Sequence, residues 1–244
     1  MTTDYNAIAQ EYKQSKQQPW RTHIECFTFF ELIGDLTGLS VLDLACGEGY
    51  YTRQLKRGGA GRVVGVDLSD GMIDLARAQE AREPLGIEYL VRDARALDLG
   101  ERFHLVVAGY LLNYAATRDE LLAMCQSIAR ALRPGCRFVS VNNNPAQPRA
   151  TFSLGRKYGF DKTAPEEPRD GTPIEWTFFL GGQSFAITNY QLSIATHEWA
   201  FHEAGFRQVH WHPPSVSPEG TAEYGNTFWR DFLDHPPVIF MECN

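Results

Sequence analysis

The hydrophobic positions of the chain form short continuous runs that alternate with amphipathic stretches. The runs predicted to be buried strands are residues 39–45, 62–68, 87–91, 103–109 and 136–141. The stretches with helical periodicity between them are 50–57, 70–82 (after the N-cap residue Ser69) and 119–132. Strands that are apolar on both faces belong to parallel sheets covered by helices. The pattern therefore predicts an α/β fold with a doubly wound, mostly parallel sheet and a ligand crevice at the carboxyl ends of its strands.

The segments outside this alternation predict a cap and an insertion. Two helical stretches, 4–16 and 20–36, precede the first strand, and two strand-like runs joined by Gly181-Gly182 predict a hairpin over 174–190. The aromatic residues of the hairpin need a surface to bury them, which favours a lid or substrate wall over a surface excursion. We expect one domain over 1–244, with a helical cap at 1–38 and a lid or substrate insertion at 142–194. The closing elements are expected at 196–204 (helix), 206–211 (strand), 224–233 (helix) and 238–243 (strand).

Composition and charge narrow the class of partner. The chain has 244 residues, with 23 Lys and Arg against 30 Asp and Glu, so its formal net charge is −7. This charge argues against binding nucleic acid or an anionic membrane surface. The five scattered cysteines include no C-x-x-C pair, and the N-terminus has no basic and then apolar leader. We expect a cytoplasmic protein without a structural metal, and His210 and His212 lack an evident third ligand.

The most informative motif is the run from Asp43 to Gly49, in which an apolar strand leads through a glycine turn into a helix. The unpaired N–H groups of such a helix start attract a ligand, and glycine permits close approach. Asp67 ends the next strand, where a carboxylate accepts hydrogen bonds from ribose hydroxyls. A dinucleotide-binding G-x-G-x-x-G motif is disfavoured, because Thr52 replaces the third glycine and Glu48 would repel a pyrophosphate.

Four motifs together resemble those of the class I S-adenosylmethionine-dependent methyltransferases. The motifs are Asp43–Gly49, Val64–Ser69, Arg92–Ala94 and Leu132–Gly135, in order within residues 36–142. The resemblance implies a Rossmann-like fold, S-adenosyl-L-methionine as cofactor, S-adenosyl-L-homocysteine as product, and no metal. It also implies that Asp43 and Gly47 hold the amino-acid end of the cofactor, Asp67 the ribose and Asp93 the adenine. The other cofactor contacts that it implies are Tyr12, Arg21, Ala45, Cys46, Leu68, Met72, Ala94 and Gly109.

Further segments point to the acceptor. Residues 5–12 resemble the start of small-molecule methyltransferases, and residues 15–21 together with 111–114 resemble the N-methyltransferases of azapteridine biosynthesis. This resemblance implies a small heterocycle whose ring nitrogens are methylated in successive steps. The residues that we expect to bind the substrate are Tyr5, Trp20, Tyr114 and Trp176, although each could instead pack in the core. Tyr110 and Asn113 follow the fourth strand and are the catalytic candidates, as groups that position the acceptor.

Two other functions remain open. One is methylation of a different small N- or O-acceptor. The other is a non-catalytic protein that binds S-adenosylmethionine.

Overall fold

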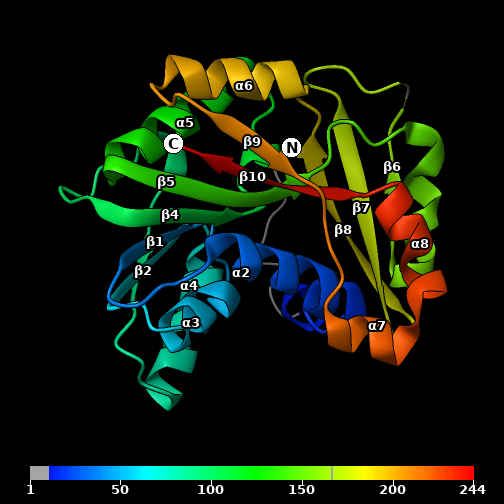
Figure 1. Ribbon diagram of the computed structural model, residues 1–244, viewed down its shortest axis with the longest axis horizontal. Helices are drawn as coiled ribbons and strands as arrows, with labels where there is room; N and C mark the ends of the chain where they lie inside the picture. The colour runs from blue at the N-terminus through cyan, green and yellow to red at the C-terminus, as the bar shows by residue number, and fades with distance from the viewer. Residues whose placement is uncertain (1–10, 166) are drawn as a thin grey trace.

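The computed structural model describes residues 11–165 and 167–244, and its centre is a seven-stranded sheet (Figure 1). The strand order is β3-β2-β1-β4-β5-β10-β9. The bounds of the strands are β1 Ser40–Leu44, β2 Arg62–Asp67, β3 Glu88–Val91, β4 Phe103–Gly109, β5 Leu132–Asn143, β9 Val209–His212 and β10 Val238–Cys243. The first five strands pair in parallel, and β10 runs antiparallel to both of its neighbours. The predicted fold class is confirmed.

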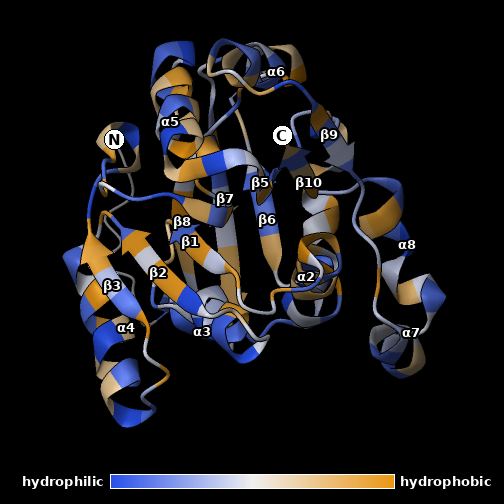
Figure 2. Ribbon diagram, turned by 60° about the vertical axis from the view of Figure 1, so that its left-hand side comes forward, coloured by the Kyte–Doolittle hydropathy of each residue, from blue (hydrophilic) through white to orange (hydrophobic). Residues whose placement is uncertain are grey.

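Helices cover both faces of this sheet and create two cores. The helices are α2 Phe27–Ile33, α3 Tyr50–Arg57, α4 Asp70–Arg82, α5 Arg118–Ala131 and α6 Ile194–Glu203. Alternate residues of one strand enter different cores: Val41 packs with α2, α3 and α4, whereas Leu42 packs with α5 and α6. This alternation explains why the strands are apolar at nearly every position. Figure 2 shows the helices with both hydrophobic and hydrophilic residues, as expected for elements that cover one face.

The insertion folds as a second, three-stranded sheet beside the first. The predicted hairpin is present as β7 Pro173–Leu180 and β8 Gln183–Tyr190. We did not predict β6 Phe160–Thr163, which pairs with β7 and contains the polar pair Asp161-Lys162, nor the 3₁₀ helix Arg149–Tyr158 that precedes it. The aromatic side chains of Phe160, Trp176, Phe178 and Phe185 are buried, whereas Phe179 is 41% exposed. Phe160 contacts Trp20 of the N-terminal segment with ring centroids 5.1 Å apart. The insertion therefore packs against the N-terminal segment.

The remaining differences concern helix and strand ends. Residues 11–15 are helical, whereas the first part of the predicted 4–16 helix lies outside the described residues. A π-helical stretch, Arg21–Cys26, leads into α2. The helix predicted at 224–233 is present as α8 Asn226–Asp234, and Gly225 (φ 76°) separates it from α7 Pro218–Tyr224, which we did not predict. Ser69 does cap α4, and its Oγ accepts a hydrogen bond from the Met72 N–H at 3.2 Å.

Candidate functional site

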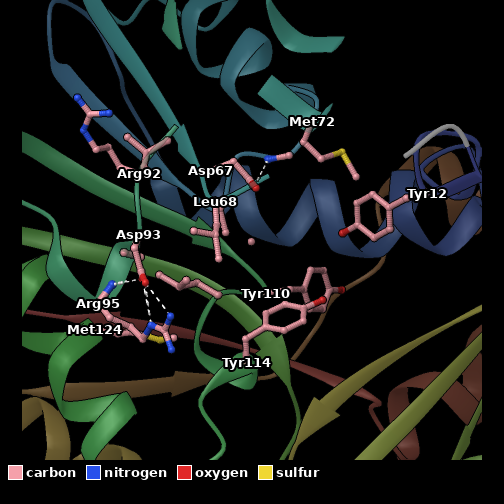
Figure 3. A pocket seen from close by; sticks show the side chains of 16 residues that line it. Tyr12, Asp67, Leu68, Met72, Arg92, Asp93, Arg95, Tyr110, Tyr114 and Met124 are labelled. Carbon is pink, nitrogen blue, oxygen red and sulfur yellow. Dashed lines mark hydrogen bonds and ion pairs between the residues drawn. The ribbon is translucent and has the colours of Figure 1, made fainter. Parts of the chain in front are cut away.

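A cavity of about 170 Å³ lies at the carboxyl ends of β1, β2 and β4, where the strand order reverses. Ligands of open α/β sheets bind in this crevice. Figure 3 shows Asp67 and Leu68 between the Asp93–Arg95 pair and the side chains of Tyr12, Tyr110 and Tyr114. The predicted cofactor and substrate residues that line this cavity are Tyr12, Ala45, Gly47, Asp67, Leu68, Met72, Asp93, Ala94, Gly109, Tyr110 and Tyr114. Their individual roles remain predictions.

The turn after β1 is built around residues with positive φ. Ala45, Gly47 and Gly49 have φ of 55°, 56° and 82°. A Cβ at Gly49 would lie 2.5 Å from the Tyr89 hydroxyl, so tight packing requires glycine there. A Cβ at Gly47 would meet no atom within 4 Å, because Gly47 faces the cavity. The turn thus presents open backbone to a ligand.

Asp67 joins this turn to the end of β2. Its Oδ2 accepts a hydrogen bond from the Gly47 N–H at 2.8 Å, and its Oδ1 accepts one from the Ser69 N–H at 2.9 Å. Burial raises the pKa of Asp67, while these two backbone donors act in the opposite direction. The carboxylate therefore lies in the cavity with its orientation fixed and with further lone pairs for a ligand.

Asp43 lies deeper, beside a small adjoining cavity that Lys16, Cys46 and Tyr51 also line. Its Oδ2 accepts a hydrogen bond from Thr52 Oγ1 at 2.6 Å, and burial raises the pKa of Asp43 to about 7. A cationic amino group at this position would favour the ionised carboxylate. Burial also raises the pKa of the Cys46 thiol, which disfavours a nucleophilic thiolate.

The other end of the main cavity is apolar and partly open. Leu68 is 62% exposed, whereas Met72 is buried beneath it. The Asp93 carboxylate is paired with Arg95, whose Nη2 lies 2.7 Å from Oδ2, and this hydrogen bond lowers the pKa of Asp93. Asp93 therefore stays charged and can accept a hydrogen bond at the rim of the cavity. A flat apolar group here would cover Leu68.

A buried carboxylate, Glu25, lies beside both cavities and was not predicted. It accepts hydrogen bonds from the hydroxyls of Tyr51 and Tyr110 and from Arg21 Nη1 at 2.8 Å, and Lys16 Nζ lies 3.7 Å away. Burial opposes the charged form, but Arg21, Lys16 and the two hydroxyls outweigh it, so the pKa of Glu25 is lowered. The sequence signal was the Arg21-Glu25 pair, whose members lie four residues apart on one helical stretch.

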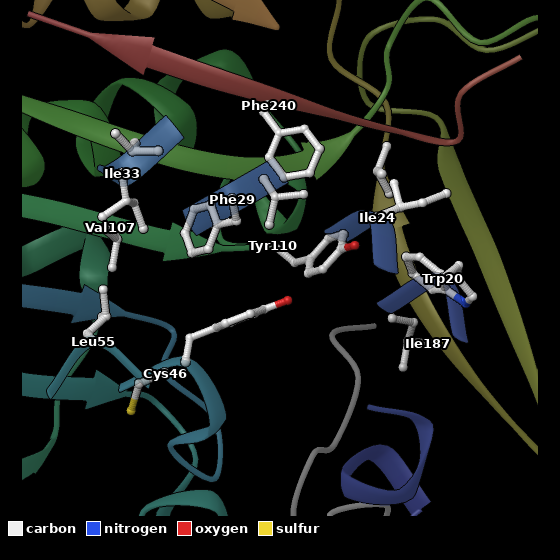
Figure 4. Packing of buried hydrophobic residues seen from close by; sticks show 14 of the residues in the cluster. Trp20, Ile24, Phe29, Ile33, Cys46, Leu55, Val107, Tyr110, Ile187 and Phe240 are labelled. Atoms are coloured by element: carbon white, nitrogen blue, oxygen red, sulfur yellow. The ribbon is translucent and has the colours of Figure 1, made fainter. Parts of the chain in front are cut away.

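Besides the small cavity at Asp43, another cavity, called the second cavity below, adjoins the main cavity on the side of β7 and β8. Its lining residues are Tyr12, Trp20, Arg21, Tyr110, Asn143, Trp176, Phe178, Ile187 and Asn189. Tyr12 and Tyr110 line both cavities. Figure 4 shows Tyr110 between the sheet residue Val107 and the helical residues Ile24 and Trp20. The predicted substrate residues Trp20 and Trp176 thus share one cavity with Arg21.

Two predicted residues are not among those that line the cavities. Asn113 is buried and follows the cavity residue Leu111 closely in the chain, but it is absent from the lining of the main and second cavities. Tyr5 lies outside the described residues. The positioning role of Asn113 and the substrate-binding role of Tyr5 stay predictions.

The strand order and the glycine turn beside Asp67 place a ligand crevice at the carboxyl ends of the parallel strands. Residues 41–135 match the family model of a methyltransferase domain. This part of the chain is therefore similar to a methyltransferase domain. Among the described residues there is no group of three or more His, Cys, Asp or Glu side chains that could hold a metal. No helix in the described part of the chain is long and apolar enough to cross a membrane.

Known proteins resemble the chain in sequence and in fold. It is 28% identical over 182 residues to the N-demethylindolmycin N-methyltransferase of Streptomyces griseus, covering 73% of this chain and 75% of that protein. It is 33% identical over 150 residues to the demethylmenaquinone methyltransferase of Lactococcus lactis, covering 59% of this chain and only 56% of that protein. The fold matches the CcbJ methyltransferase of Streptomyces caelestis with a TM-score of 0.68 at 22% identity, covering 100% and 98% of the two chains. It also matches a methyltransferase of Mesorhizobium loti with a TM-score of 0.66 at 19% identity, covering 94% and 99%.

Proposed function

We propose that this protein transfers the methyl group of S-adenosylmethionine to a small heteroaromatic acceptor. The observation that carries the proposal is the pair of adjoining cavities that share Tyr12 and Tyr110. One has the polar groups of a nucleoside site, and the other has aromatic walls. A transferase that joins two substrates needs such neighbouring sites, because reaction requires the two reacting atoms to approach closely.

The residues of the main cavity fit the proposed cofactor. Asp67 offers lone pairs for the two ribose hydroxyls, and Asp93 and the exposed Leu68 suit the polar edge and the face of adenine. Gly47 leaves open space where a side chain would obstruct the ligand. Asp43 is a buried carboxylate without an ionic partner of its own among the described residues, and it suits the amino group.

In this proposal the cofactor supplies an electrophilic methyl group bound to a sulfonium. Tyr110 lines both cavities and follows Gly109 of the main cavity, so these two residues would align the acceptor nitrogen with that methyl group. The aromatic walls exclude water from the acceptor. Orientation of this kind can contribute up to ~7–11 kcal/mol, and no covalent enzyme intermediate is needed.

For the particular acceptor we propose 1,6-didemethyltoxoflavin, an azapteridine that would be methylated in two successive steps to toxoflavin. The support is the resemblance of residues 15–21 and 111–114 to azapteridine N-methyltransferases, and the flat aromatic character of the second cavity. The similarity to an N-demethylindolmycin N-methyltransferase is compatible with transfer to a nitrogen of a small molecule.

We also propose that the chain acts as one domain in which residues 1–38 cap the site and residues 142–194 form its acceptor wall. The support is that the second cavity takes Trp20 and Arg21 from the first segment and Trp176 and Asn189 from the second.

The test is mass spectrometry after incubation with methyl-labelled S-adenosylmethionine and 1,6-didemethyltoxoflavin. Two successive labelled methyl additions are expected. Transfer to a different N- or O-acceptor only would replace the azapteridine by that acceptor. Tight cofactor binding without transfer to any compound of an acceptor panel would favour a non-catalytic binder.

A further inference from the structure

Three polar atoms on the lining residues of the second cavity have no hydrogen-bond partner within the described part of the chain. They are Arg21 Nε, Asn143 Oδ1 and Trp176 Nε1. Arg21 and Trp176 are each 2% exposed. Buried polar atoms nearly always have a partner, and leaving one without costs free energy. Three such atoms around one cavity therefore point to a ligand that supplies the missing partners.

The amide of Asn143 is held in one orientation. Its Nδ2 donates to Asn189 Oδ1 at 3.1 Å, and Asn189 Nδ2 in turn donates to the Thr188 carbonyl at 3.3 Å. This chain of donors leaves Asn143 Oδ1 as the free acceptor. Asn143 ends β5, so it lies on the same edge of the sheet as the main cavity.

The two donors are held equally firmly. The Trp176 indole stacks between Phe160 and Phe178, with ring centroids 5.0 Å and 5.8 Å away. Arg21 is anchored through Nη1 to Glu25, and its guanidinium lies 5.3 Å from the centroid of the Phe178 ring. Nε of Arg21 and Nε1 of Trp176 each carry a hydrogen that can only be donated.

The cavity thus offers two donors and one acceptor between aromatic faces. A cyclic amide or imide edge matches this set, because it combines carbonyl acceptors with an N–H donor in the plane of the ring. A carboxylate has no donor for Asn143, and an unsubstituted aromatic ring satisfies none of the three. We propose that the protein recognises its acceptor by a cyclic amide or imide edge, with Trp176 and Asn143 as specificity-determining residues. This inference rests on the proposed function and names the class of its substrate.

The second cavity is too small to hold the acceptor without rearrangement. Its volume is about 10 Å³, enough for a single water and too small for a ring. Tyr12 forms part of the wall between the two cavities, and its ring contacts Phe185 of β8 edge-on with centroids 6.4 Å apart. Entry of the acceptor therefore requires part of the wall to move, and displacement of Tyr12 would join the second cavity to the main one.

The test compares two bicyclic probes of similar size, lumazine with an imide edge and quinoxaline without one. Calorimetry measures the affinity of each probe in the presence of saturating S-adenosylhomocysteine. Lumazine is expected to bind at least about tenfold more tightly to the unaltered protein. Trp176→Phe keeps the stacking face and removes the N–H, and Asn143→Ala removes the acceptor. Each is expected to weaken lumazine binding by about 5- to 100-fold, and quinoxaline binding by less than about twofold.

Trp199→Phe is the matched control, because Trp199 lies on α6 beside Arg118, away from both cavities. It should leave both probes unchanged. Equal binding of lumazine and quinoxaline, or variants that weaken both probes alike, would overturn the assignment while S-adenosylhomocysteine still binds. Absence of S-adenosylhomocysteine binding would overturn the proposed function, and the assignment with it.

Discussion

Removal of the Asp67 carboxylate is the most direct test of the cofactor site. In Asp67→Ala, the ligand would lose two hydrogen bonds to a charged group, each worth about 1.5–3 kcal/mol. The sum of about 3–6 kcal/mol corresponds to a rise in Kd of about 10²- to 10⁴-fold. The backbone N–H groups of Gly47 and Ser69 would also lose their acceptor, so the turn after β1 would be less firmly held.

The two effects separate experimentally. Calorimetry with S-adenosylhomocysteine measures the affinity, and denaturant unfolding measures stability, which should fall by only about 1–3 kcal/mol because Asp67 is partly exposed. Asp70→Ala is the control, since Asp70 is exposed in the first turn of α4 and does not line the cavity. An unchanged Kd for Asp67→Ala would refute the assigned role. Equal losses in both variants would show that the α4 terminus, and not the carboxylate, matters.

Three further outcomes follow from buried ionisable groups. Because burial raises the pKa of Asp43 to about 7, cofactor affinity should rise with pH up to about 7 and then level, and binding below that pH should release a proton. Calorimetry in buffers of different ionisation enthalpy measures both the affinity and the released proton. An affinity that does not change with pH would contradict the role of Asp43. Glu25→Gln leaves Arg21 buried without its counter-ion and should destabilise the fold by about 3–5 kcal/mol, as measured by urea unfolding. Since the pKa of Glu25 is lowered in the fold, its contribution to stability is present at neutral pH and lost on acidification, so the stability of the variant should fall less steeply as the pH is lowered. Burial lowers the pKa of Lys162 from 10.5 to about 7, so the unfolded chain binds more protons than the folded chain between these pH values, and stability should rise with pH across that window. Lys162→Met should abolish this rise in urea unfolding experiments. If the variant keeps the same pH profile of stability, other groups cause the rise.

The central strands of the sheet were predictable because β1, β2 and β4 are buried on both faces. Runs such as 62–68 and 103–109 are apolar at most positions, and Ser69 marks the start of α4 in the sequence itself. The position of Asp67 followed from the same logic, because the carboxyl ends of adjacent parallel strands meet at one edge. At Asp67, the position predicted from the strand pattern and the position in the structure therefore agree.

The acceptor side was less predictable because it is assembled from distant segments. Glu25 and Arg21 lie on one helical stretch, and only the fold brings Tyr110 to Glu25 across 85 residues of chain. Asn143 of the main sheet and Asn189 of the insertion lie 46 residues apart in sequence and meet only through a side-chain hydrogen bond between the two sheets. Asn113 follows β4 in sequence, and the 3₁₀ turn Leu112–Tyr114 buries its side chain, so its positioning role stays a prediction.

The shared wall formed by Tyr12 links the occupancy of the two cavities. Whichever ligand first displaces this side chain bears the free energy of the displacement, and the second ligand then meets a site that is already open. The two affinities are therefore coupled, and the coupling must have the same size in both directions. A single tyrosine on the N-terminal segment would thus favour the ternary complex over either binary one, without any direct contact between the ligands.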